Sequence, residues 1–195
     1  KDETYYLNEA RSAFARGQFE QGLRWYSKVL EYNPNNAEAW AGQVRMLIEL
    51  GEYREAKVWA DKALEKLPTA PELLAAKAVA LGRLGDLKAA LAFSDASMEE
   101  HGEAPYTWLA RGDIMLASKE KFADYCFEKA MMLAGKNWFY AWLVSRVYAF
   151  YEKFALALKY AQQAITWDAG QSVAWLQAGH CQFAIGLVPG ARASF

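Results

Sequence analysis

The chain has 195 residues, of which 54% are hydrophobic and 23% are charged, a balance typical of globular proteins and not of disordered chains. Its 22 lysines and arginines nearly cancel its 23 acidic residues, so no strong basic field attracts nucleic acid or an anionic membrane. Two distant cysteines, Cys126 and Cys181, indicate neither a disulfide framework nor a metal motif, and they favour a reducing compartment. We therefore predict a cytoplasmic protein without membrane insertion.

The first predicted element is a helix that starts near Tyr6 and ends at Gly17. Glycine tolerates the left-handed backbone conformation that ends many helices. A second amphipathic run follows and stops at Pro34, because proline cannot continue a helix. In the stretch "NPNN", Asn36 can cap the helix that comes next. The chain thus opens with a helix, a turn, a second helix and a corner.

The same order of elements recurs along the chain with a period of about 34 residues. Trp40 opens the next unit, Gly51 ends its first helix and Pro68 ends its second. Units four and five lack the turn glycine and read "LASKEKF" and "AFYEKF". A large anchor opens each of the other units, and we expect a glycine to end the first helix of three of them: the anchors are Tyr6, Leu74, Trp108, Trp142 and Trp175, and the glycines are Gly17, Gly85 and Gly186.

These residues resemble the tetratricopeptide repeat, which has tryptophan, leucine-glycine and tyrosine in its first helix and alanine, an aromatic residue, alanine and proline around its second. The second unit matches best, through Trp40, Leu47, Gly51, Tyr53, Ala56, Ala63, Leu64 and Pro68. The resemblance implies an all-α fold, a right-handed superhelical solenoid of antiparallel helix pairs. We expect a single domain over 1–195, with repeats at about 3–36, 37–70, 71–104, 105–138, 139–171 and a partial repeat at 172–195, as a fragment of a longer chain.

Residues that could carry out catalysis are few. His180 is next to Cys181, but consecutive helical residues point about 100° apart, so the two side chains are poorly placed to hold one metal ion. The sequence has no glycine-rich phosphate loop, nucleophile elbow or paired-histidine zinc motif. We predict a protein that is not an enzyme, with no catalytic residue, no cofactor and no metal.

The stretch "NWFYAWLVSRVYAFY", residues 137–151, holds more aromatic residues than repeat packing requires. Its helix is apolar nearly all round and needs cover on two sides. In the family, the first helix of each pair lines a concave groove. The resemblance therefore implies that Tyr140, Leu143, Val147 and Phe150, with Tyr151 beside them, face a partner. Packing of this helix against a close neighbour or a second copy explains the pattern equally well.

The same positions of the other repeats complete the predicted partner-binding groove. We expect it to be cationic near its three arginines and apolar to aromatic farther along the chain. These further groove residues are Arg11, Arg45, Arg83, Tyr106, Leu109, Asp113 and His180.

The sequence thus predicts a non-catalytic scaffold that binds a peptide or helix of a partner protein in the groove. The first alternative is self-assembly, since the last repeat lacks its closing half and its open end could stack weakly on another copy through Phe183, Ile185, Val188 and Phe195. RNA binding by helical repeats is a weaker alternative, because the net charge is near zero and no repeated base-reading pair is present. We predict a protein or peptide ligand and no nucleic acid.

Overall fold

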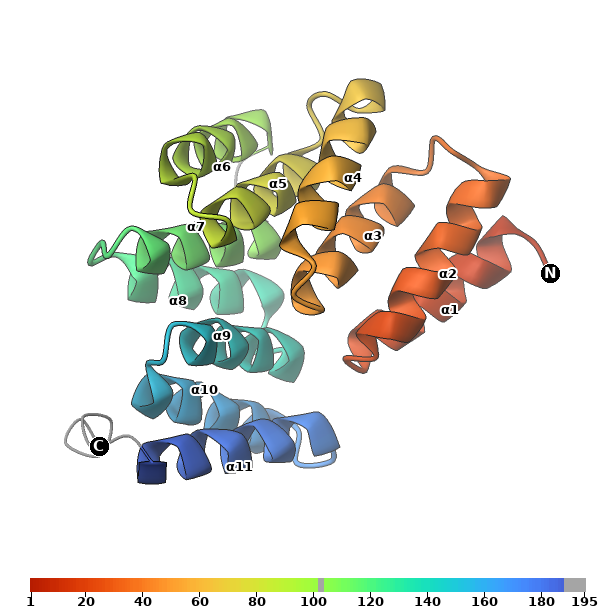
Figure 1. Cartoon of the computed structure of the whole chain (residues 1–195). Coiled ribbons are helices and arrows are strands. Elements are labelled where there is room, and N and C mark those ends of the chain that lie inside the picture. The colour runs from red at the N-terminus through yellow and green to blue at the C-terminus, as the bar shows by residue number, and fades with distance from the viewer. Residues whose placement is uncertain (102–103, 188–195) are drawn as a thin grey trace. The chain divides into compact units, whose positions relative to one another are not determined.

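The computed structural model describes residues 1–101 and 104–187, and the chain divides into two compact units, 1–123 and 124–195 (Figure 1). Within the described ranges the elements are eleven α-helices and no strand, which confirms the all-α prediction. The prediction that the repeats form a single domain stays a prediction.

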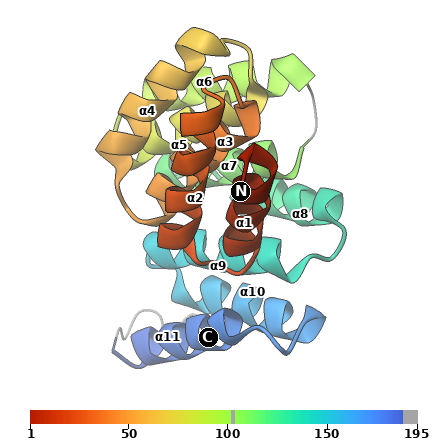
Figure 2. The ribbon, with the colours of Figure 1, turned by 90° about the vertical axis from the view of Figure 1, so that its right-hand side faces the viewer.

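Unit 1 contains three complete helix pairs and the first helix of a fourth, and Figure 2 shows α1 and α2 lying antiparallel. The first helices of the six repeats begin at residues 3, 37, 71, 105, 138 and 172, close to the predicted period. In unit 1 the helices are α1 (Glu3–Ala15), α2 (Phe19–Tyr32), α3 (Ala37–Glu49), α4 (Tyr53–Lys66), α5 (Pro71–Arg83), α6 (Leu87–His101) and α7 (Pro105–Ala117). In unit 2 they are α8 (Ala123–Ala134, which begins at the unit boundary), α9 (Trp138–Phe150), α10 (Phe154–Trp167) and α11 (Ser172–Leu187).

The turns inside the pairs use a left-handed residue in five repeats. Gly17, Gly51 and Gly85 have φ angles of 73°, 79° and 94°, as the turn glycines predict. Lys119 and Glu152 adopt φ angles of 58° and 59° at the equivalent turns of repeats four and five. A side chain in this conformation costs roughly 1 kcal/mol, so these two turns form at a steric cost that the glycines avoid.

In the sixth repeat the glycine at the expected turn does not end the first helix. Gly186 lies inside α11, which continues to Leu187, so the prediction that this glycine ends the helix is wrong. Glycine permits a left-handed stop without requiring one. The residues predicted to start the second helix of this repeat, Val188 to Phe195, lie outside the described residues.

The corners between pairs are built by local hydrogen bonds. Asn36 Oδ1 accepts a bond of 2.9 Å from the amide of Ala39, which confirms the predicted cap of α3. Trp40 Nε1 donates to the carbonyl oxygen of Pro34 at 2.7 Å, and the Trp40 side chain is buried. The tryptophan therefore holds the corner and fills the space between pairs.

Small residues let the helices approach closely. Ala56, Ala60 and Ala63 on one face of α4 are 0% exposed. A Cβ atom on Gly42 would lie 2.5 Å from the ring of Tyr26, so only glycine fits where α3 meets α2. These contacts set how closely neighbouring helices of unit 1 approach one another.

Candidate protein-binding face

Three arginines of unit 1 each join one first helix to the next. An arginine of α1, α3 or α5 donates to a carboxylate of α3, α5 or α7, at N to O distances between 2.5 and 3.1 Å. A carboxylate of the following repeat neutralises each arginine, so the prediction of a groove that is cationic near its arginines is wrong. We call the positions of the first helices that were predicted to line this groove the inner positions. The pairs, called the arginine ladder below, are Arg11–Glu38, Arg45–Glu72 and Arg83–Asp113.

The arginine side chains of the ladder are most exposed in repeat one and most buried in repeat three. The side chain of Arg11 is 53% exposed, and its hydrogen bond to Glu38 raises the pKa of the guanidinium. The side chains of Arg83 and Asp113 are only 8% and 6% exposed, and they form two bonds, of 3.1 and 2.8 Å. Arg83 also donates to the hydroxyl oxygen of Tyr53 at 2.7 Å. Removal of one member of such a buried ion pair is destabilising, because the other member loses the opposite charge beside it.

Arg45 lies between two aromatic rings. Its guanidinium carbon is 3.7 Å from the ring centroid of Tyr106 and 4.5 Å from that of Phe14. These cation–π contacts supplement the 2.8 Å bond to Glu72, and Arg45 is only 9% exposed. Phe14 belongs to α1 and Tyr106 to α7, so repeats one and four both contact the same guanidinium. Solenoid repeats usually contact only their direct neighbours. Here side chains of repeats one and four meet at an arginine of repeat two, so the protein's own side chains fill the predicted groove of unit 1.

The other predicted groove residues of unit 1 are buried as well. Tyr106 is 9% exposed, and Leu109 and Asp113 are each 4% exposed. Burial raises the pKa of the Tyr106 hydroxyl. The expectation that these side chains face solvent is wrong, because the ladder and the aromatic contacts enclose them. Of the predicted residues in unit 1, Arg11 is the exposed one.

In unit 2, the predicted stripe of α9 is buried at its centre and open at its end. Leu143 and Val147 are 2% and 6% exposed, so their predicted exposure is wrong, as expected for a helix that is apolar nearly all round. Phe150 is 47% exposed, and Tyr140 and Tyr151 are half-buried. The rings of Phe150 and Tyr151 meet edge to face at 5.0 Å. The accessible aromatic surface of α9 therefore lies around Phe150.

The last predicted residue, His180, is exposed on α11. Its ring lies 6.4 Å from that of Phe154 on α10, nearly perpendicular to it. Beside it, Gln177 Nε2 donates to the hydroxyl of Ser145 at 3.2 Å and joins α11 to α9. A neutral hydrogen bond here links successive first helices, where unit 1 uses ion pairs.

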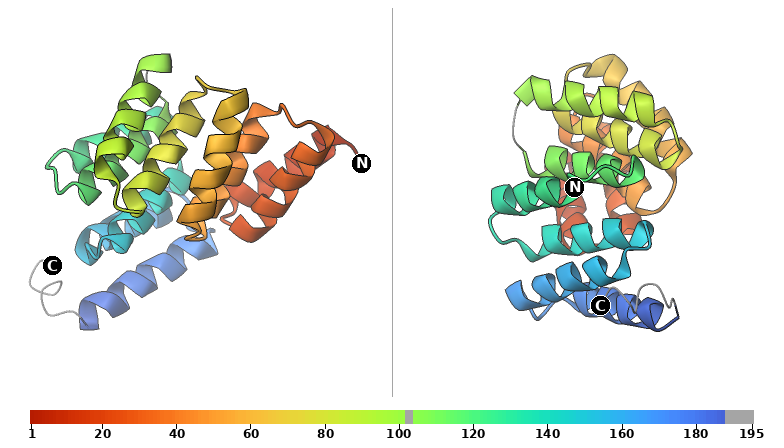
Figure 3. Two further views of the ribbon diagram at one scale, coloured as in Figure 1. Left: turned by 45° about the horizontal axis from the view of Figure 1, so that its top comes forward. Right: turned by 90° about the vertical axis from the view of Figure 1, so that its left-hand side faces the viewer.

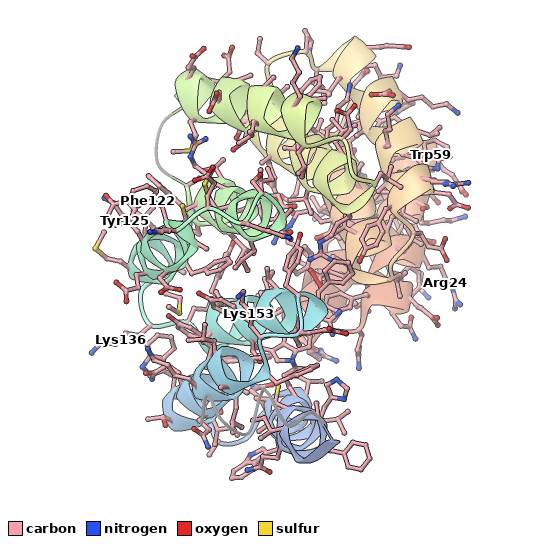
Figure 4. All side chains as sticks on the ribbon, turned by 60° about the vertical axis from the view of Figure 1, so that its left-hand side comes forward. Arg24, Trp59, Phe122, Tyr125, Lys136 and Lys153 are labelled. Atoms are coloured by element: carbon pink, nitrogen blue, oxygen red, sulfur yellow. The ribbon has the colours of Figure 1, made fainter. Side chains whose placement is uncertain are left out.

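A second apolar feature of unit 2 lies on its second helices. Tyr125 and Met132 of α8 are 55% and 63% exposed, and Figure 4 shows Tyr125 and Lys136 pointing away from the ribbon. Sequence reasoning missed this surface because it followed the first helices, although the methionine pair at 131 and 132 was a visible signal. A cavity of about 500 Å³ is lined by Met131, Met132, Gly135, Lys136 and Trp167.

Groups suited to metal binding do not converge within residues 1–101 and 104–187, where no three His, Cys, Asp or Glu side chains could hold an ion. Cys126 and Cys181 are buried and form no disulfide, and burial raises the pKa of the Cys181 thiol. Over the same ranges, no helix has the length and apolarity needed to cross a membrane.

The comparison with protein-family models finds a match in the part of the chain that contains the turn glycines Gly17 and Gly51 and the corner prolines Pro34 and Pro68. Residues 13–80 match the family model of the tetratricopeptide repeat. This part of the chain consists of tetratricopeptide repeats. A comparison with curated protein sequences found no match.

Solved structures extend the likeness to nearly the whole chain. The thermophilic tetratricopeptide-repeat protein TTC0263 of Thermus thermophilus is 18% identical over 93% of this chain and 99% of its own, with a TM-score of 0.69. A chain of the APC/C hetero-tetramer Cut9–Hcn1 is 14% identical over 97% of this chain and 38% of its own, with a TM-score of 0.61. MamA from Desulfovibrio magneticus RS-1 is 18% identical over 87% of this chain and 96% of its own, with a TM-score of 0.50.

At these identities the likeness shows the fold, an all-α tetratricopeptide-repeat solenoid, and no shared ligand. Proteins with this fold are commonly protein-interaction modules and are generally non-catalytic.

Proposed function

We propose that this tetratricopeptide-repeat protein is a non-catalytic scaffold that binds a peptide or helix of a partner protein at the end of α9. The observation that carries the proposal is Phe150, an aromatic side chain 47% exposed on a first helix whose centre is buried. Tyr151 packs against it at 5.0 Å and supports its ring. Rigid aromatic side chains beside a packed core are typical anchors of protein interfaces.

The chemistry of this surface favours an apolar ligand side chain. Tyr140, Phe150 and Tyr151 carry no formal charge. In unit 1 the ladder charges are already paired and the central arginine is enclosed, so we propose no anchoring site there. Arg11 and its partner Glu38 are accessible charges of that unit, and such exposed charges orient a partner more than they anchor it.

The substitution Phe150→Arg tests the proposal. Because the ring is half exposed, we expect the melting temperature to change by less than about 2 °C. Capture of partner proteins from an extract of the source cells, quantified by mass spectrometry against the unmodified chain, should fall at least about tenfold for a defined subset of proteins.

A matched control is Val58→Arg, at a position 50% exposed on α4. It introduces the same charge at similar exposure on a second helix, and the captured proteins should be unchanged. Equal losses for the two variants, or no loss for either, would contradict binding at α9. Unfolding of Phe150→Arg would show that this ring is part of the core.

Other parts of the functional prediction stay proposals. We propose a cytoplasmic location, supported by two cysteines that form no disulfide. RNA binding would show itself as an affinity that falls steeply with added salt, and the near-neutral charge speaks against it. Self-assembly through the last repeat is the main alternative to partner binding.

A further inference from the structure

The cavity of unit 2 lies between the second helices of repeats four and five, α8 and α10, and both helices lie within the described residues. The C-terminal ends of these helices form it, and α10 itself packs along α9 (Figure 3). Its volume of about 500 Å³ is within the range of ligand-binding pockets. The cavity is therefore a candidate site on the second helices, distinct from the surface around Phe150 on a first helix.

The lining of the cavity is mainly apolar. Met131 is 9% exposed, Trp167 is half-buried and Met132 is 63% exposed. A Cβ atom added at Gly135 would meet nothing within 4 Å, so space is open beside this residue. Methionine side chains adapt to the shape of an apolar ligand, and an indole ring adds a large rigid surface. The lining thus suits one large apolar side chain.

The exposed methionine departs from the surface pattern of the other repeats. One position of the second helix is at most 1% exposed in five repeats and gives the register, namely Val29, Ala63, Ser97, Ala130 and Ala164. Two residues after it, repeats one to three have the exposed glutamates Glu31, Glu65 and Glu99, spaced by 34 residues. Repeat four has Met132 there. Because three repeats pack with a glutamate at this position, packing does not account for the methionine.

The polar groups of the lining are hydrogen-bond donors. Lys136 is its charged residue, points away from the ribbon (Figure 4) and forms no ion pair within residues 1–101 and 104–187. The indole N–H of Trp167 has no acceptor within the same ranges. Asp168, the next residue, already accepts bonds from the amide of Gly170 at 3.0 Å and from Gln171 at 2.9 Å. An ammonium group and an indole N–H beside apolar side chains suit a carboxylate attached to an apolar group.

We propose that this cavity binds the C-terminal residue of a partner protein, with its large apolar side chain against Met131 and Met132 and its carboxylate at Lys136. A chain end carries both groups on one carbon atom, which matches a small apolar cavity with a single cation at its edge. An internal acidic residue places its carboxylate and the neighbouring apolar side chain on different residues, so it fits less well. The proposal does not rest on partner binding at α9.

Methyl NMR of the methionines is the direct test. The chain has five methionines, so isotope labelling of their methyl groups gives five signals, and substitution by leucine assigns those of Met131 and Met132. The probe is a glycine-serine pentapeptide that ends in phenylalanine with a free carboxylate. We expect it to shift these two signals with a dissociation constant on the order of 1 mM, as befits a single anchoring residue. The same peptide with a C-terminal amide should bind at least about tenfold more weakly.

Two substitutions test the lining without disturbing the fold. Met132→Glu restores the residue type that repeats one to three carry, so the melting temperature should change by less than about 2 °C. Its charge should weaken binding of the carboxylate peptide, followed at Met131, at least about tenfold. Lys136→Asn removes the cation, and asparagine tolerates the left-handed φ of 55°. This variant should bind the carboxylate peptide and the amide equally weakly.

A matched control is Lys119→Asn, the same substitution at a lysine with a φ of 58° in unit 1, which should leave peptide binding unchanged. Equal losses for the two lysine variants would overturn the proposal. So would equal affinity of the unmodified chain for the carboxylate and the amide peptide, or no shift at Met131 and Met132 up to about 10 mM peptide. Phe150→Arg should not alter these shifts, which separates a failure here from a failure of partner binding at α9.

Discussion

The two units use the same helix repeat but join successive first helices by different chemistry. In unit 1 the inner positions carry arginines and carboxylates that pair across each step from α1 to α7. In unit 2 a neutral hydrogen bond between Gln177 and Ser145 joins α11 to α9. Stability in such repeats comes mainly from contacts between neighbours, so the inner positions are available for other tasks. In unit 1 they lock the stack, and in unit 2 they leave aromatic surface exposed.

The largest contrast is expected between equivalent tryptophans. Trp40→Ala removes a side chain that is 7% exposed and bonded to its corner, and should cost about 3–5 kcal/mol of unfolding free energy. Trp175→Ala removes one that is 56% exposed, with a similar bond to Ala169, and should cost less than about 1.5 kcal/mol. Urea unfolding at a concentration where the chain is monomeric measures both. Equal losses would mean that α11 is covered in solution.

The next contrast lies within the arginine ladder. Asp113→Ala removes a buried carboxylate that forms two bonds with Arg83 and should cost about 3 kcal/mol, whereas Glu38→Ala at the exposed end should cost less than about 1 kcal/mol. Urea unfolding in 0.05 and 0.5 M salt measures both losses.

A matched double variant checks the reason for the ladder contrast. Arg83→Met combined with Asp113→Leu removes both charges and should recover most of the stability lost in Asp113→Ala. A double variant no more stable than Asp113→Ala would show that the site needs the ion pair itself.

The smallest effects are expected at the turns, where the units should behave alike. Lys119→Gly in unit 1 and Glu152→Gly in unit 2 each relieve a left-handed side chain, with φ angles of 58° and 59°. After the entropic cost of glycine in the unfolded chain, each should stabilise the protein by about 0.5 kcal/mol, measured as a rise in the urea midpoint. Gly85→Ala should have the opposite sign. Different signs for Lys119→Gly and Glu152→Gly would show that the turns, and not only the inner faces, distinguish the units.

The sequence predicted what depends on nearby residues. The anchor spacing located the helices, and the cap at Asn36 followed because a side chain and an amide three residues apart meet at any helix start. The turn at Gly51 followed for the same local reason. These features need no knowledge of how one repeat lies on the next.

The side-chain contacts that the sequence did not predict depend on distances between repeats. The groove was expected to be cationic near its arginines, because the pairing of Arg45 with Glu72 depends on how closely α3 approaches α5, which the sequence does not give. The contact of Tyr106 with that arginine depends on the approach of repeats two steps apart.

Site-specific photocrosslinking tests most directly the claim that unit 2, and not unit 1, presents the binding surface. Benzoylphenylalanine placed at position 11 and at position 150 samples one exposed inner position of each unit, at Arg11 and at Phe150. We expect irradiation in a cell extract to attach the same partner protein repeatedly at position 150 and to give only background at position 11. A specific partner attached at position 11, with background alone at position 150, would contradict the division of roles between the two units.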